Sequence, residues 1–117
     1  MTSTQAQHED WHHEDWHAAV ELILAARREA RAVITYKDLA RDAAVPPPHT
    51  IHKLTLFLEQ LIETDIALGQ PLRAALAVSR SRGIPGDGFF VKLKDCGLQP
   101  EHGEDEADWH QRLLNQL

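Results

Sequence analysis

The 117-residue chain carries a formal net charge of -6, and 43% of its residues are hydrophobic. This length and composition indicate one globular domain, and no apolar run approaches the roughly 20 residues that a transmembrane helix needs. The single cysteine, Cys96, excludes an internal disulfide framework. The N-terminus has neither the cationic nor the apolar region of a signal peptide, so we expect a cytoplasmic protein without membrane contact.

Charge is distributed unevenly along the chain. Residues 1–26 hold five acidic residues and no Lys or Arg, and residues 95–117 hold six acidic residues and only Arg112. Residues 27–94 hold eleven Lys or Arg against seven acidic residues. Overall acidity argues against strong nonspecific binding of nucleic acid, which depends on neutralising phosphates, whereas the basic middle is compatible with a local nucleic-acid site.

A tandem repeat of His-Glu-Asp-Trp-His occupies residues 8–12 and 13–17. On a helix the two histidines of each repeat lie four residues apart, a spacing at which two imidazoles can share one metal ion. Two histidines are only part of a ligand set, so we expect no bound metal here. The sequence predicts an acidic, His-rich extension over residues 1–15, with Trp16 as the first core residue.

Two helices and a short extended segment follow the repeat. The apolar stripe Trp16, Val20, Ile23 and Leu24 predicts a helix that closes at its arginines, whose charges suit a helix C-terminus. Residues 32–34 are expected to be extended. Thr35 and Asp38 then form a capping-box pattern that opens a second helix through residues 39–43, and the prolines at 46–48 stop it.

The longest and most apolar helix is predicted to follow, with Thr50 as its N-cap and Gly69 at its end. Its core positions follow a spacing of 3.6 residues: Ile51, Leu54, Leu58, Leu61 and Ile62. We assign Glu59, Glu63 and Asp65 to its outer, solvated face.

Residues 71–98 combine a predicted strand, a basic turn, a Gly/Pro turn and a helix start. Alternation over residues 72–78 predicts a strand with one apolar face. Residues 85–88 form a turn, and Asp87 within it is expected to cap a helix that ends at Gly97. In the alternative interpretation, Phe89 begins a return strand. The spacing of Phe89, Leu93 and Cys96 favours the helix, with Cys96 as a small buried hydrophobe.

The chain is expected to end with an acidic loop over residues 100–106 and an amphipathic helix that docks on the domain. The apolar positions of that helix are Trp109, Leu113, Leu114 and Leu117. We therefore divide the chain into the extension at 1–15, a domain at 16–98 and a docked tail at 99–117.

This order of elements predicts a mainly α fold with a small β element, a winged helix-turn-helix-like single domain. In such a fold the helix after the turn enters the major groove of DNA through its N-terminal residues, and basic turns contact phosphates. The candidate nucleic-acid-binding residues are His49, Thr50, His52, Lys53, Arg80, Arg82 and Lys92.

Residues 33–98 resemble the C-terminal DNA-binding domain of DNA alkyltransferases and alkyltransferase-like proteins. The resemblance lies in the run at residues 34–40, the helix pair, the segment from Pro71 and the Gly-rich turn. Those proteins carry a Pro-Cys-His-Arg motif or a version in which the Cys is replaced. This chain has Pro71-Leu72-Arg73, so alkyl transfer is not expected. Residues 79–80 and 85–90 are also similar to small uncharacterised bacterial proteins with a winged-helix-like domain.

We find no catalytic constellation or cofactor motif, and expect a non-enzymatic protein that binds or regulates nucleic acid without a cofactor. The alternative is a protein-interaction or dimerisation module, with Trp11 and Trp109 exposed at the interface. Charge geometry separates the two hypotheses. A face that gathers Lys53, Arg80 and the other candidate cations free of carboxylates favours DNA, whereas acidic cover favours a protein partner.

Overall fold

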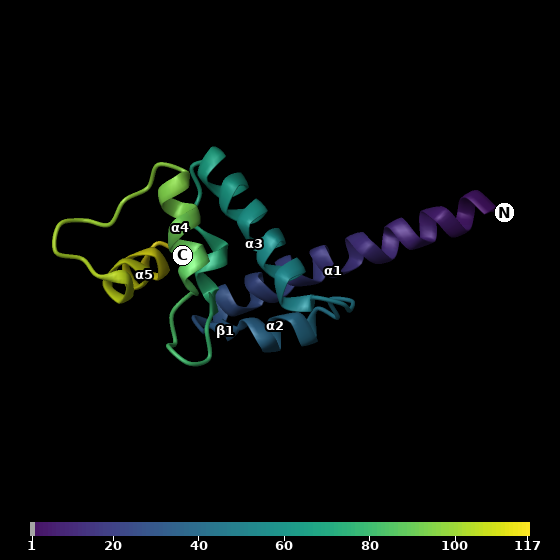
Figure 1. The fold of residues 1–117 in the computed structure, drawn as a ribbon, viewed down its shortest axis with the longest axis horizontal. Helices are drawn as coiled ribbons and strands as arrows, with labels where there is room; N and C mark the ends of the chain where they lie inside the picture. Colours follow the sequence, from purple (N-terminus) through teal and green to yellow (C-terminus); the bar gives the residue numbers. More distant parts are fainter. Residues whose placement is uncertain (1) are drawn as a thin grey trace.

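The structure is a computed structural model that describes the backbone of residues 2–117 and the side chains from Asp15 onward. The chain is mainly helical with a small two-stranded sheet, as the sequence predicts (Figure 1). The elements in chain order are α1 (Thr2–Ala30), β1 (Ile34–Thr35), α2 (Tyr36–Asp42), α3 (Thr50–Ala67), the 3-10 helix η1 (Arg73–Leu76), β2 (Ala77–Val78), α4 (Asp87–Asp95) and α5 (Glu106–Asn115).

Helix α1 has two parts with different surroundings. From Trp16 onward its apolar stripe packs in the core, where Val20 and Leu24 are fully buried. The N-terminal part extends away from the rest of the molecule (Figure 1). The sequence places His8, His12 and His13 at a spacing suited to metal binding, and their side chains lie outside the described residues.

The predicted strand at 72–78 is largely wrong. Residues 73–76 form η1, and only Ala77 and Val78 pair with β1, in parallel. The alternating pattern predicted an extended strand with an apolar face and a face of small residues, but the chain turns helical at 73–76 and the residues from Ala74 to Val78 are all buried. Helices cover this segment on both sides, so close packing, and not the alternation of a strand, accounts for its small alanine side chains. Within residues 2–117 no β-hairpin forms, so the winged variant of the fold stays a prediction.

The start of α2 is confirmed and the start of α3 differs by one residue. The Asp38 amide donates to Thr35 Oγ1 at 3.2 Å, as the capping-box pattern predicts. At α3 the N-cap is His49, in the left-handed conformation with φ 59°, and Thr50 is the first helical residue. The prediction that Thr50 caps the helix is therefore wrong.

The apolar face of α3 forms the centre of the core, with one charged exception. Leu54, Leu58 and Ile62 are buried as expected, whereas Ile51 stays 44% exposed. Asp65, assigned above to the outer face, is fully buried. That assignment is wrong because Asp65 lies on the core side of the helix, where it meets a cation from η1.

Helix α4 confirms the helical alternative for residues 87–95, with Phe89, Phe90 and Leu93 buried. Its N-cap is Gly86, and no side chain accepts a bond at the cap, so the prediction that Asp87 is the cap is wrong by one residue. Gly97 has φ 90° and follows the helix end, as predicted.

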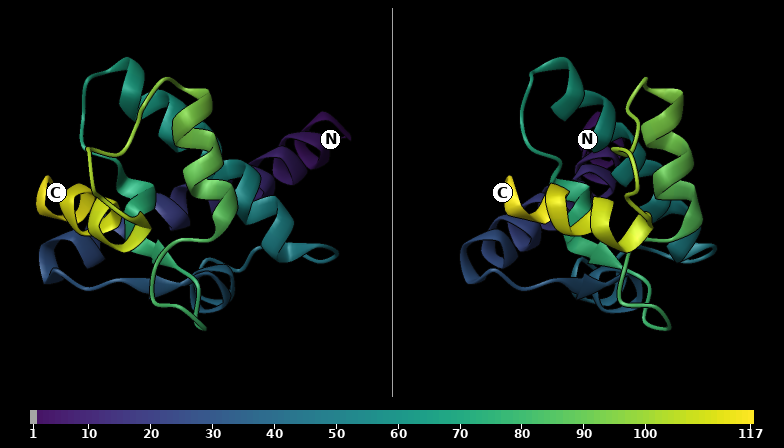
Figure 2. Two further views of the ribbon diagram at one scale, coloured as in Figure 1. Left: turned by 60° about the vertical axis from the view of Figure 1, so that its left-hand side comes forward. Right: turned by 90° about the vertical axis from the view of Figure 1, so that its left-hand side faces the viewer.

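Helix α5 packs against η1 and α4, as Figure 2 shows for the yellow C-terminal segment. Trp109 is only 2% exposed and lies 5.7 Å from Phe90 between ring centroids, so it belongs to the core and not to an exposed interface. His110 Nε2 donates to the Ala75 carbonyl at 2.7 Å, and burial lowers the pKa of this imidazole. The docked form of α5 therefore favours a neutral His110.

A carboxylate–guanidinium pair orders the acidic loop before α5. Arg112 donates to both oxygens of Glu104 at 2.8 Å, and this contact lowers the pKa of Glu104 to about 2. None of the helices in the described part of the chain combines the length and apolarity that crossing a membrane requires.

Candidate functional site

The predicted DNA-reading residues lie together at the N-terminus of α3. His49 and His52 are exposed and Thr50 is partly buried. Lys53 turns back, and its ammonium donates to the Pro46 carbonyl at 3.1 Å, where it stabilises the Pro-rich connector. Three of the four side chains at this helix end are therefore available to a ligand, and one has a structural bond.

A groove of about 470 Å³ separates α2 from the N-terminus of α3. Val45 and Ala40 are buried at its base, and the partly exposed Ile51 flanks them. Lys37 and Arg41 are the charged residues that line it. The lining is thus an apolar floor with cationic side chains and no carboxylate: Lys37, Ala40, Arg41, Val45, Thr50 and Ile51.

The two groove cations differ in how they are paired. Arg41 contacts Asp38 at 3.2 Å and Asp42 at 3.0 Å, and the hydrogen bond that Arg41 donates to Asp42 is the main cause that raises the pKa of Arg41. Lys37 is exposed and forms no ion pair with any residue whose side chain is described. Lys37 is therefore the cation of the groove that is free to bind an external carboxylate.

The remaining candidate cations are divided between free and neutralised. Arg82 contacts Asp87 at 3.1 Å and Glu106 of α5 at 3.0 Å. Arg80 is exposed and has no ion-pair partner among the described side chains. The hydrogen bond with Glu106 is the largest cause that raises the pKa of Arg82, so the acidic tail covers one of the two turn arginines.

Lys92 is neutralised by α3 itself. Its ammonium donates to Glu63 at 2.6 Å, and this bond is the main cause that raises the Lys92 pKa. The carboxylates of Glu63, Asp87 and Glu106 thus pair with two of the candidate cations, Lys92 and Arg82.

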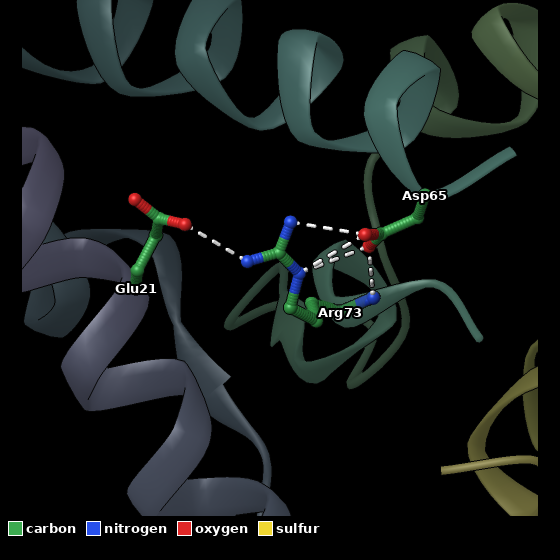
Figure 3. A network of polar contacts seen from close by, with 3 residues as sticks. All are labelled: Glu21, Asp65 and Arg73. Carbon is green, nitrogen blue, oxygen red and sulfur yellow. Dashed lines mark hydrogen bonds and ion pairs between the residues drawn. The ribbon is translucent and has the colours of Figure 1, made fainter. Parts of the chain in front are cut away.

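Sequence patterns did not predict the ion pair that makes the most contacts among the described side chains (Figure 3). Arg73 of η1 donates from Nη2 and Nε to the buried Asp65, at 2.9 Å and 3.1 Å, and from Nη1 to Glu21 of α1 at 2.9 Å. The Asp65 hydrogen bond is the largest cause that raises the Arg73 pKa. Arg73 therefore ties α1, α3 and η1 together, and the neighbouring Leu72 is core, 4% exposed.

The described side chains were predicted to hold no metal, and two polar groups among them have structural contacts. From Asp15 onward no group of three His, Cys, Asp or Glu could hold a metal ion. Tyr36 accepts the Gly86 amide at its hydroxyl, and burial raises the Tyr36 pKa, so this phenol has a structural role. Cys96 is partly buried against the core.

Comparison of the chain with protein-family models, with curated proteins and with solved structures finds no match. Any functional assignment must therefore come from the chemistry of the groove and of the charged surface around it.

Proposed function

We propose that the protein is a non-enzymatic interaction module that self-associates, with the groove between α2 and α3 holding residues 8–12 from a second copy of the chain. The observation that carries this proposal is the groove itself, which has a volume of about 470 Å³ and an apolar floor. Lys37 and Arg41 line it, and no carboxylate does. Its volume suits one large apolar side chain with flanking residues.

The first His-Glu-Asp-Trp-His repeat has the complementary chemistry. Glu9 and Asp10 precede Trp11, and residues 1–26 contain no Lys or Arg. Tryptophan buries a large apolar area on docking, and adjacent carboxylates would reach Lys37 at the rim. In the second repeat Trp16 is already in the core, 5% exposed, so the proposal gives the docking role to the tryptophan of the first repeat.

The backbone geometry favours docking between two molecules. Helix α1 runs without interruption from Thr2 to Ala30, and its N-terminal part points away from its own domain (Figure 1). A straight helix cannot bring residues 8–12 back to the groove of the same molecule. Reciprocal exchange between two copies would close a twofold dimer.

We expect the purified chain to form a dimer that weakens at least fivefold when Lys37 is replaced by Glu. The charge reversal removes the free cation and adds repulsion against Glu9 and Asp10. Sedimentation equilibrium gives the dissociation constant. Lys94→Glu is the matched control, because Lys94 is an exposed lysine of α4 without an ion pair among the described side chains, and it should leave the dimer intact. A monomer at all concentrations would refute the proposal.

Nucleic-acid binding is the second candidate, favoured by the exposed His49 and His52 at the start of α3 and by Arg80, which has no ion-pair partner from Asp15 onward. Another of the candidate cations, Lys92, is paired with Glu63, which lowers its attraction for phosphate. We expect the wild-type chain to bind a random duplex-DNA pool weakly, and Arg80→Ala to weaken that binding by a similar factor on all sequences. Tight, sequence-selective binding that survives Arg80→Ala would place recognition elsewhere.

A further inference from the structure

A second cavity, separate from the α2–α3 groove, lies where the end of α1 meets α5. It has a volume of about 400 Å³ and opens between the last turn of α1, the extended segment that follows it, and the C-terminal turn of α5. Figure 2 shows the blue end of α1 beside the yellow end of α5 in both views. Neither the groove nor the candidate DNA residues contribute to its lining.

Two arginines without ion pairs line this cavity. Among the side chains that the structure describes, neither Arg28 nor Arg31 contacts a carboxylate or donates a side-chain hydrogen bond. Every arginine from residue 41 onward except Arg80 does contact a carboxylate: Arg41, Arg73, Arg82 and Arg112. A bound anion would offset the positive charge of two guanidiniums that line one cavity.

Arg31 stands at the backbone position after a helix that usually holds glycine. The Ala32 amide donates to the Arg27 carbonyl at 3.0 Å and the Arg31 amide to the Arg28 carbonyl at 3.2 Å, which is the hydrogen-bond pattern of a Schellman motif. Arg31 occupies its left-handed position with φ 53°, where glycine avoids steric cost. The arginine side chain is thus present at a position whose backbone favours glycine.

The rest of the lining determines which anion fits. Gln111 donates to Asn115 Oδ1 at 3.0 Å, which leaves the Asn115 amide nitrogen as a donor. Leu76 is buried and Leu114 partly buried, and together with Val33 they give the cavity an apolar side. A guanidinium binds a carboxylate through two parallel hydrogen bonds, and the apolar side would contact a hydrocarbon group.

We infer that this cavity binds a small organic carboxylate with an apolar tail, held by Arg28 and Arg31. The probe is octanoate, titrated into the full chain and followed by isothermal calorimetry and by amide NMR shifts. We expect a dissociation constant below about 1 mM, with shifts concentrated at residues 28–33 and 111–115. Acetate, which lacks the tail, should bind at least tenfold more weakly.

Variants separate binding from folding. Arg28→Gln combined with Arg31→Gln should weaken octanoate at least tenfold, whereas Lys94→Gln should leave it unchanged. Arg31→Gly should weaken binding and yet raise Tm by about 4 °C, because glycine relieves the left-handed backbone. Ala44→Gly is the matched control: Ala44 has φ 56° in the same position after α2, so Tm should rise without loss of octanoate binding.

Three outcomes would overturn the inference. If octanoate fails to bind at a concentration fivefold above about 1 mM, the arginines have only an electrostatic role at the C-terminus of α1. Equal affinity for octanoate, acetate and inorganic phosphate would show that the apolar side of the cavity contributes nothing to binding. Shifts at the α2–α3 groove instead of residues 28–33 would move the ligand to the other cavity.

Discussion

Replacing Arg73 by alanine should lower the free energy of unfolding by about 3–5 kcal/mol, because it leaves a buried carboxylate without its cation. The side chain of Asp65 is only 1% exposed, and both of its oxygens accept from Arg73. The Arg73 backbone amide would still donate to Asp65 Oδ2, at 3.1 Å in the present structure, but it carries no charge. Urea denaturation followed by tryptophan fluorescence measures the loss.

Two further variants assign that loss to the pairing. Asp65→Asn with Arg73→Met removes both charges, and its cost should be smaller than that of Arg73→Ala, since no charge stays buried unpaired. Glu21→Gln removes only the half-exposed partner of Arg73, and it should cost at most about 1 kcal/mol. If Arg73→Ala cost no more than Glu21→Gln, the buried pair would contribute nothing to stability.

Replacing Trp109 by alanine should also cost about 3–5 kcal/mol, because it empties the contact between α5 and the core. Trp109 is 2% exposed and contacts Phe90, which is 1% exposed. The loss should include undocking of α5, which would expose His110 and free Arg82 from Glu106. Hydrogen exchange of the α5 amides, measured with the unfolding free energy, tests both effects.

A conservative variant keeps this prediction measurable even if the alanine variant does not fold. Trp109→Phe retains an aromatic ring and should lose less stability than Trp109→Ala, with α5 still protected from exchange. Leu68→Ala is the exposed control, since Leu68 is 63% exposed and its truncation should change stability little. Full protection of α5 in a folded Trp109→Ala chain would contradict the central place of this residue in docking.

Local signals in the sequence predicted most of the helical content. The Thr35 capping pattern, the apolar period of α3 and the glycine after α4 each act within a few residues, and the structure confirms them. The errors at Thr50 and Asp87 are one-residue shifts of a cap, which local sequence determines poorly. The predicted strand failed because burial on both sides of η1 depends on helices distant in the chain.

Contacts between distant residues could not be predicted in the same way. Asp65 was assigned to solvent because an acid on a long helix usually is solvated, and its partner Arg73 lies beyond the helix end. The neutralisation of Lys92 by Glu63 and of Arg82 by Glu106 likewise joins residues 29 and 24 positions apart. These pairs decide the electrostatic character of the surface, so charge counts by segment misjudged it.

The most direct test of self-association is a charge swap measured by sedimentation equilibrium. Lys37→Glu should weaken the dimer, Asp10→Lys should weaken it as well, and the chain carrying both changes should recover at least half of the lost free energy, because the attraction is restored with reversed signs. Losses that simply add in the double variant, or a wild-type chain that stays monomeric, would contradict docking of residues 8–12 in the groove between α2 and α3.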